Sequence, residues 1–192
     1  PQRVRGAPGR RCGGEVLSRL DQLWAGWRHA YVASLGGDAP LDGVESGVPD
    51  GPTLFEAIEQ SGLDDSETFI VHRGETCFVL LNAYPYTSGH MMVLPRRAVA
   101  TLDGLDAAEH EELWATVRDA VAAVESAFSP GGVNVGLNLG PAAGAGVPGH
   151  LHVHVVPRWS GDTNFTTTTA DLRVLPEALG DSWRRLREAW PA

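Results

Sequence analysis

The chain contains no lysine, and all 15 of its basic residues are arginine. A P-loop lysine, a lysine Schiff base and a lysine nucleophile are therefore excluded. Any phosphate group would have to be held by backbone amides, arginine or histidine.

Cysteines and long apolar runs are also scarce. Cys12 and Cys77 lie far apart, so they predict no disulfide framework and favour a cytoplasmic location. The basic N-terminal residues are not followed by the apolar stretch of a secretory signal. No run of eighteen apolar residues is present, so we expect no membrane span. The formal net charge of −9 argues against a nucleic acid or an anionic membrane surface as partner.

The length of 192 residues and the hydrophobic content of 43% predict one globular domain with an appended arm. In residues 1–51 we expect a basic arm, an amphipathic helix over about 15–35, where apolar residues recur every three or four positions, and a linker. Residues 52–192 are expected to form the domain.

Periodicity and turn residues predict the elements of this domain. We expect strands near 68–72, 76–82 and 90–94, the third stopping at Pro95. The clearest helix spans 106–128: Asp106 and Glu109 form a capping box, and a buried stripe follows. The stripe consists of Leu113, Val117, Val121, Val124 and Phe128. A last helix is predicted over 177–190. This order indicates an α+β fold with a mostly antiparallel sheet.

Three histidines alternate with apolar residues in the segment His150-Leu151-His152-Val153-His154-Val155-Val156. In an extended strand successive side chains face opposite ways, so the imidazoles would share one face, about 7 Å apart. The intervening apolar side chains would then point into the core.

A second alternating strand precedes the histidines. Between residues 132 and 140 the odd positions are apolar and the even positions are glycine or asparagine. Glycines on one face suggest that something approaches the backbone closely. The connecting loop, 141–149, is rich in small residues, whose exposed N–H groups can cradle an anion. If the two strands pair antiparallel, Asn138, the loop amides and the three histidines converge on one patch.

Two chemistries could use such a patch. Alternating strand histidines are good zinc ligands, although no cysteine or glutamate follows at a useful spacing. Alternatively, one neutral imidazole attacks phosphorus and leaves again, while its neighbours orient it and stabilise negative charge. We favour the second interpretation.

The histidine segment resembles the signature of the histidine triad (HIT) superfamily of nucleotide hydrolases and transferases. Asn82-Ala83-Tyr84-Pro85-Tyr86-Thr87-Ser88-Gly89-His90 is similar to a second segment of that superfamily. The segments 136–140, 143–146, 156–165 and 23–31 resemble its diadenosine tetraphosphate (Ap4A) phosphorylase or hydrolase-like branch. The resemblance implies a HIT-like α+β fold with a long helix and a C-terminal helix, following an N-terminal helical extension.

The resemblance also implies a role for each candidate residue. His152 would attack the α-phosphorus and carry a nucleotidyl group, and His154 would contact the phosphate and assist the leaving group. His150 would keep the array in register, with His90 as additional support. Asn82 would bind the ribose. The base would lie among Phe55, Ile58, Leu80 and Met92, and the phosphates would be received by Asn138, Gly144, Ala145 and Gly146. The substrate would be a nucleotide and the assembly a homodimer.

The sequence departs from the superfamily at several positions. Many members hold a structural zinc with a Cys-x-x-Cys pair and a histidine, where this chain has Thr53, Glu56 and Ala98. We therefore expect no zinc and no required cofactor, with Mg²⁺ as a companion of a polyphosphate substrate. Ala145 and Gly146 replace the Gln and Ser or Thr of other branches. This leaves the acceptor open between water and phosphate. A phosphoramidase, a biosynthetic nucleotidyltransferase and a non-catalytic nucleotide-binding regulator remain alternatives.

Overall fold

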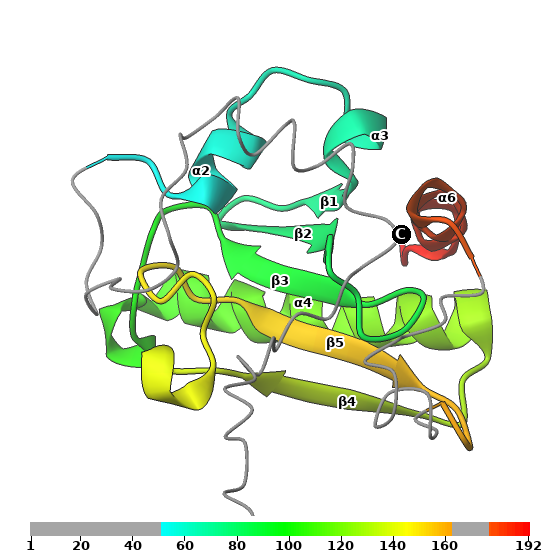
Figure 1. Cartoon of the computed structure of the whole chain (residues 1–192). Coiled ribbons are helices and arrows are strands. Elements are labelled where there is room, and N and C mark those ends of the chain that lie inside the picture. Colours follow the sequence, from blue (N-terminus) through cyan, green and yellow to red (C-terminus); the bar gives the residue numbers. More distant parts are fainter. Residues whose placement is uncertain (1–50, 163–176) are drawn as a thin grey trace, which may run out of the picture.

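The computed structural model describes residues 51–162 and 177–192, where five strands form one sheet in the order β1-β2-β3-β5-β4 (Figure 1). The strands are β1 (Ile70–Arg73), β2 (Cys77–Leu81), β3 (Met91–Pro95), β4 (Gly132–Leu137) and β5 (Val153–Arg158). Every neighbouring pair is antiparallel. The predicted α+β fold with an antiparallel sheet is confirmed.

The helices are α2 (Leu54–Glu59), α3 (Asp65–Thr68), α4 (Ala107–Phe128) and α6 (Leu179–Ala189), with short 3₁₀ turns at Leu102–Gly104 and Pro141–Ala143. Helix α4 begins as predicted. The Asp106 carboxylate accepts from the N–H of Glu109, and the Glu109 carboxylate accepts from the N–H of Asp106. The helix and linker predicted before residue 51 lie outside the described residues. None of the described helices combines the length and the apolar character needed to cross a membrane.

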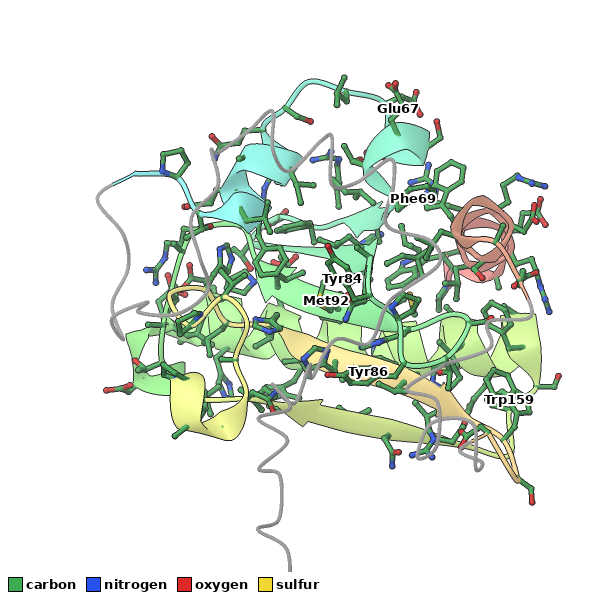
Figure 2. All side chains as sticks on the ribbon, viewed as in Figure 1. Glu67, Phe69, Tyr84, Tyr86, Met92 and Trp159 are labelled. Carbon is green, nitrogen blue, oxygen red and sulfur yellow. The ribbon has the colours of Figure 1, made fainter. Side chains whose placement is uncertain are left out.

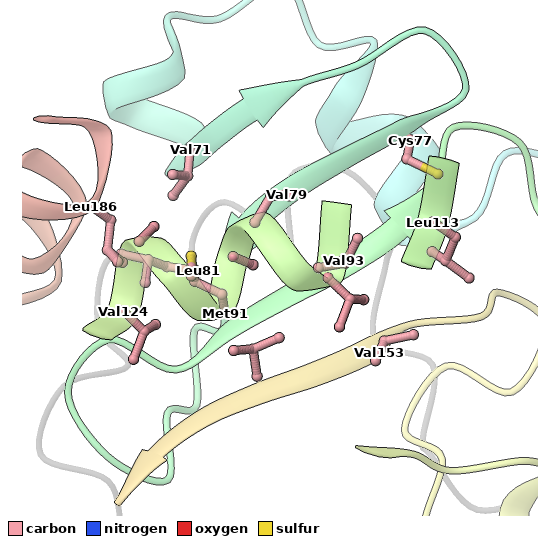
Figure 3. Close-up of a cluster of buried hydrophobic side chains, with 14 residues drawn as sticks. Val71, Cys77, Val79, Leu81, Met91, Val93, Leu113, Val124, Val153 and Leu186 are labelled. Carbon is pink, nitrogen blue, oxygen red and sulfur yellow. The ribbon is translucent and has the colours of Figure 1, made fainter. Parts of the chain in front are cut away.

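Helix α4 packs across one face of the sheet, and α6 lies beside it against β1 (Figure 1). The predicted stripe of α4 supplies this core: Leu113, Val117 and Val124 are buried, while Val121 and Phe128 are partly buried against them. Figure 3 shows Leu113 and Val124 of this stripe together with inward side chains of the sheet such as Val93 and Val153. Val153 and Val155 of the histidine segment belong to this cluster, as their alternation predicted.

The histidine strand begins later than predicted. Strand β5 starts at Val153, so His150 and His152 lie in the segment that leads into it. The pairing with β3 ends at Val93 and Val153, two residues before Pro95, which has no N–H to donate. Instead the N–H of Leu151 donates to the carbonyl of Val99 at 2.7 Å.

Strand β4 is the edge of the sheet and pairs with β5 in the predicted antiparallel sense. The apolar odd positions of this strand do not all pack: Val135 remains 44% exposed because its strand lies at the edge of the sheet. Gly136 lies directly opposite His154. A Cβ added at Gly136 would meet nothing within 4 Å, so the surface beside His154 is open.

Candidate active site

The four predicted histidines gather in one cluster. The ring centroids of His152 and His154 are 5.0 Å apart, and those of His90 and His154 are 5.1 Å apart. The ring of Phe55, on helix α2, lies 5.4 Å from both His150 and His152. His90 and His150 are fully buried, and His152 is nearly so. The loop before β3, helix α2 and the segment entering β5 thus meet around these imidazoles.

The hydrogen bond of the His152 ring shows which of its two nitrogens carries the hydrogen. Its Nδ1 lies 2.8 Å from the backbone carbonyl of His150, and a carbonyl can only accept, so Nδ1 carries the hydrogen. Burial lowers the pKa of His152, which keeps the ring neutral at pH 7. The Nε2 atom of His152 therefore holds a free lone pair, which is what a nucleophile requires.

A second chain of hydrogen bonds assigns the proton of His154. The N–H of Tyr86 donates to Nδ1 of His90 at 3.1 Å, so the hydrogen of His90 is on Nε2. That Nε2–H donates to Nδ1 of His154 at 3.0 Å. Burial, with a smaller contribution from nearby His152, lowers the pKa of His154 to about 4. Neutral His154 therefore carries its hydrogen on Nε2 and can donate it to a phosphate oxygen.

The buried imidazoles should make the free energy of unfolding decrease as the pH is lowered. Burial lowers the pKa values of His150, His152 and His154 from the ordinary 6.5. Below that pH the unfolded chain binds more protons than the folded protein. The free energy of unfolding is therefore expected to decrease as the pH falls from 7 to 5, where carboxylates hardly titrate. Urea unfolding at a series of pH values measures this, and a constant free energy across that range would contradict it.

The residues predicted around a base do cluster, on the sheet face opposite α4. Phe55, Ile58, Leu80 and Met92 belong to one buried group. Ile58 and Leu80 are completely buried, whereas Phe55 and Met92 each keep 5% exposure. Phe55 and Met92 are therefore the members that a base could touch, with Ile58 and Leu80 behind them.

The predicted polar ligands are partly engaged within the protein. Asn82 accepts from the N–H of Tyr84 at 2.9 Å, and its Nδ2 lies 3.5 Å from Nδ1 of His90. Asn138 donates to the carbonyl of Gly144 at 3.3 Å. The N–H groups of Gly144 and Ala145 donate to carbonyls of their own loop, those of Pro141 and Gly140. The tight turns of this loop use both amides, and the role of Gly144 and Ala145 toward a phosphate stays a prediction.

The three positions of the superfamily's zinc ligands come together at His150. Thr53 Oγ1 lies 2.7 Å from Nδ1 of His150, and Glu56 accepts from the N–H of Ala98 at 2.9 Å. Within residues 51–162 and 177–192, no three His, Cys, Asp or Glu side chains are arranged to hold a metal ion. Hydrogen bonds link Thr53, Glu56 and Ala98 to one another and to His150.

Tyr86 is a neighbour of the histidines to which the sequence analysis assigned no role. Its ring lies 4.7 Å from that of His90 and 6.1 Å from that of His154, and 48% of the residue is exposed. Figure 2 shows it in front of β5, with Met92 on the neighbouring strand. The only signal in the sequence was its place in the segment that ends at His90.

Comparison with known proteins identifies the family of this chain. Residues 64–161 match the HIT domain family. The chain is 42% identical over 174 residues to an AP-4-A phosphorylase of Mycobacterium tuberculosis, covering 90% of this chain and 85% of that protein. This chain belongs to the HIT family. It is also 36% identical over 93 residues to a bis(5'-nucleosyl)-tetraphosphatase (asymmetrical) of Schizosaccharomyces pombe, which covers 48% of this chain and 50% of that protein.

Solved HIT structures share the fold. A histidine triad nucleotide-binding protein of Sulfolobus tokodaii superimposes with a TM-score of 0.58 and 26% identity, over 71% of this chain and 91% of that one. A zinc-bound histidine triad family protein of Mycobacterium smegmatis gives 0.57 and 28%, with the same coverage.

Proposed function

We propose that this HIT protein is an enzyme that cleaves a nucleoside polyphosphate, Ap4A in particular, through a nucleotidyl group on His152. The observation that carries the proposal is the lone pair on Nε2 of His152 beside the N–H of His154. The first atom can attack phosphorus, and the second can donate to a phosphate oxygen as negative charge develops. The 42% identity to an AP-4-A phosphorylase supports the substrate.

The reaction has two displacements. Nε2 of His152 forms a bond to the α-phosphorus, and the bond from that phosphorus to the bridging oxygen breaks. Its electron pair leaves with ATP. An acceptor then attacks the same phosphorus, the N–P bond breaks, and the imidazole regains its lone pair. We propose inorganic phosphate as the acceptor, on the basis of the similar phosphorylase.

Product analysis tests both substrate and acceptor. Ap4A is incubated with the protein in the presence and absence of inorganic phosphate, and nucleotides are separated by chromatography. Phosphorolysis yields ATP and phosphate-dependent ADP, whereas attack by water yields ATP and AMP. AMP in place of ADP would overturn phosphate as the acceptor. Turnover of nucleoside phosphoramidates but not of Ap4A would overturn the substrate, and tight nucleotide binding without turnover would identify a regulator.

We also propose a homodimer that joins at the edge of the sheet. Strand β4 has an unpaired edge within the described residues. Val135 of this strand is 44% exposed, and Leu139, which follows the strand, is 48% exposed. Such an edge pairs readily with another chain. Light scattering that gives the mass of one chain would contradict the dimer.

The remaining proposals concern cofactor and location. We propose that the attacking ring nitrogen comes from the chain without a resident metal, and that Mg²⁺ accompanies the polyphosphate. The free thiol of Cys77 and a nucleotide substrate support a cytoplasmic location.

A further inference from the structure

Helix α2 begins with a partly buried hydrogen-bonded unit of Thr53 and Glu56. The N–H of Thr53 donates to Oε2 of Glu56 at 2.8 Å, and the N–H of Glu56 donates to Oγ1 of Thr53 at 3.3 Å. The same Glu56 carboxylate accepts from the N–H of Ala98 at 2.9 Å. This is a capping box, and its threonine is only 3% exposed.

This capping box differs from the two others of the described chain. Helices α3 and α4 begin with Asp64 and Asp106, acidic N-caps that are exposed to solvent. At α2 the cap is a threonine in the interior, and its hydroxyl is closer to His150 than to the backbone that it caps. The Oγ1 to Nδ1 distance is 2.7 Å, against 3.3 Å to the N–H of Glu56. Capping alone does not require that contact.

The direction of the contact follows from the other nitrogen of His150. Nε2 lies 2.8 Å from the carbonyl of Pro95, so it carries a hydrogen. Burial lowers the pKa of His150, and in the neutral ring Nδ1 must accept. The Thr53 hydroxyl therefore donates to Nδ1 of His150 at 2.7 Å and not to Oε2 of Glu56, which lies 3.1 Å away. Glu56 instead holds the backbone of Thr53 by accepting from its N–H. The ring of His150 is fixed at both nitrogens.

The backbone of His150 in turn fixes the ring of His152. The carbonyl of His150 accepts from Nδ1 of His152 at 2.8 Å, the bond that leaves the lone pair on Nε2. Phe55, between Thr53 and Glu56 in the sequence, places its ring 5.4 Å from both imidazoles. The first turn of α2 thus contacts the segment that bears the nucleophile through a hydrogen bond and through an aromatic ring.

We propose that Thr53 and Glu56 are positioning residues: the Thr53 hydroxyl, held by Glu56, fixes His150 and thereby orients the lone pair of His152. The inference rests on the proposed function, in which that lone pair attacks phosphorus. It gives α2 a role in the reaction beyond lining the base site with Phe55.

The test compares Thr53→Val, which removes the hydroxyl at nearly constant volume, with Thr53→Ser, which keeps it. We expect Thr53→Val to lower kcat about ten- to a hundredfold with little change in KM, because a small misorientation of the nucleophile is costly. Thr53→Ser should restore most of the rate. Glu56→Gln should lower kcat in the same direction, and it provides the test if Thr53→Val does not fold.

Imidazole ¹H–¹⁵N spectra supply a readout that needs no substrate. In the unaltered protein His152 should show its hydrogen on Nδ1, and Thr53→Val should convert it to a mixture of tautomers. Thr76→Val is the matched control. The hydroxyl of Thr76 donates to Glu112 of α4 at 2.5 Å, and its backbone N–H donates to the same carboxylate at 2.9 Å, as the N–H of Thr53 does to Glu56. This variant should change neither kcat nor the His152 tautomer.

The outcomes separate the two proposals. If the unaltered protein turns over no nucleotide, the proposed function fails, while the spectra still test the positioning. If it turns over Ap4A and Thr53→Val keeps both kcat and the single His152 tautomer, the positioning role is overturned. An equal loss of kcat in Thr76→Val would also overturn it, since the effect would then be one of general stability.

Discussion

Replacing His152 with asparagine is expected to lower turnover of Ap4A by about 10³-fold or more, because the atom that forms the bond to phosphorus is lost. The asparagine Nδ2 can still donate to the carbonyl of His150, which now accepts from the histidine at 2.8 Å. The fold should therefore survive. Steady-state rates and acid-quenched detection of the nucleotidyl-protein measure the effect.

His110→Asn is the matched control for this substitution. His110 is exposed on α4, where its Nε2 accepts from the indole N–H of Trp114. We expect its kcat and its yield of nucleotidyl-protein to equal those of the unaltered protein. If His152→Asn retains more than about a tenth of the rate, the assignment of the nucleophile is wrong.

A side chain added on the open surface beside His154 should lower activity without lowering the free energy of unfolding. Gly136→Val places a branched side chain opposite His154, where an added Cβ meets nothing within 4 Å. Valine suits a strand better than glycine, so the free energy of unfolding should be unchanged or higher by about 0.5–1 kcal/mol. The same side chain would occupy space that a bound nucleotide needs. We expect kcat/KM for Ap4A to fall roughly a hundredfold.

Gly132→Val makes the same change on the same strand, away from the imidazoles. Gly132 pairs with Arg158, and it also has open space at its Cβ position. Stability should respond as in Gly136→Val, and kcat/KM should stay near that of the unaltered protein. Urea unfolding and initial rates are measured on both variants. Full activity in Gly136→Val would show that substrate does not lie over this part of β4.

The elements that the sequence predicted well are those decided by local chemistry. Asp106 and Glu109 are three residues apart, so their reciprocal bonds form wherever the helix packs. The apolar stripe that begins at Leu113 and the alternation of Val153 and Val155 each specify a buried face by period alone. The four clustered histidines could likewise be predicted from the segments 82–90 and 150–156 that contain them.

Other features depended on contacts that are remote in the sequence. Strand β5 starts at Val153, where its pairing with both neighbouring strands ends and where the preceding Leu151 bonds to Val99 instead. Val135 is exposed because β4 is the edge of the sheet, which alternation within one strand cannot show. The amides of Gly144 and Ala145 donate to carbonyls within tight turns. A run of small residues does not predict which turns form.

The sequence by itself determined the chemistry available to this protein: three alternating imidazoles that can supply a nucleophile, no lysine, and a glycine-lined strand beside the histidines. Only the tertiary structure decided which nitrogen of each ring holds the proton. Those protons are set by the carbonyls of His150 and Pro95, the N–H of Tyr86 and the hydroxyl of Thr53. A ring nitrogen donates or accepts according to the partner that faces it, and folding brings most of these partners from other parts of the chain.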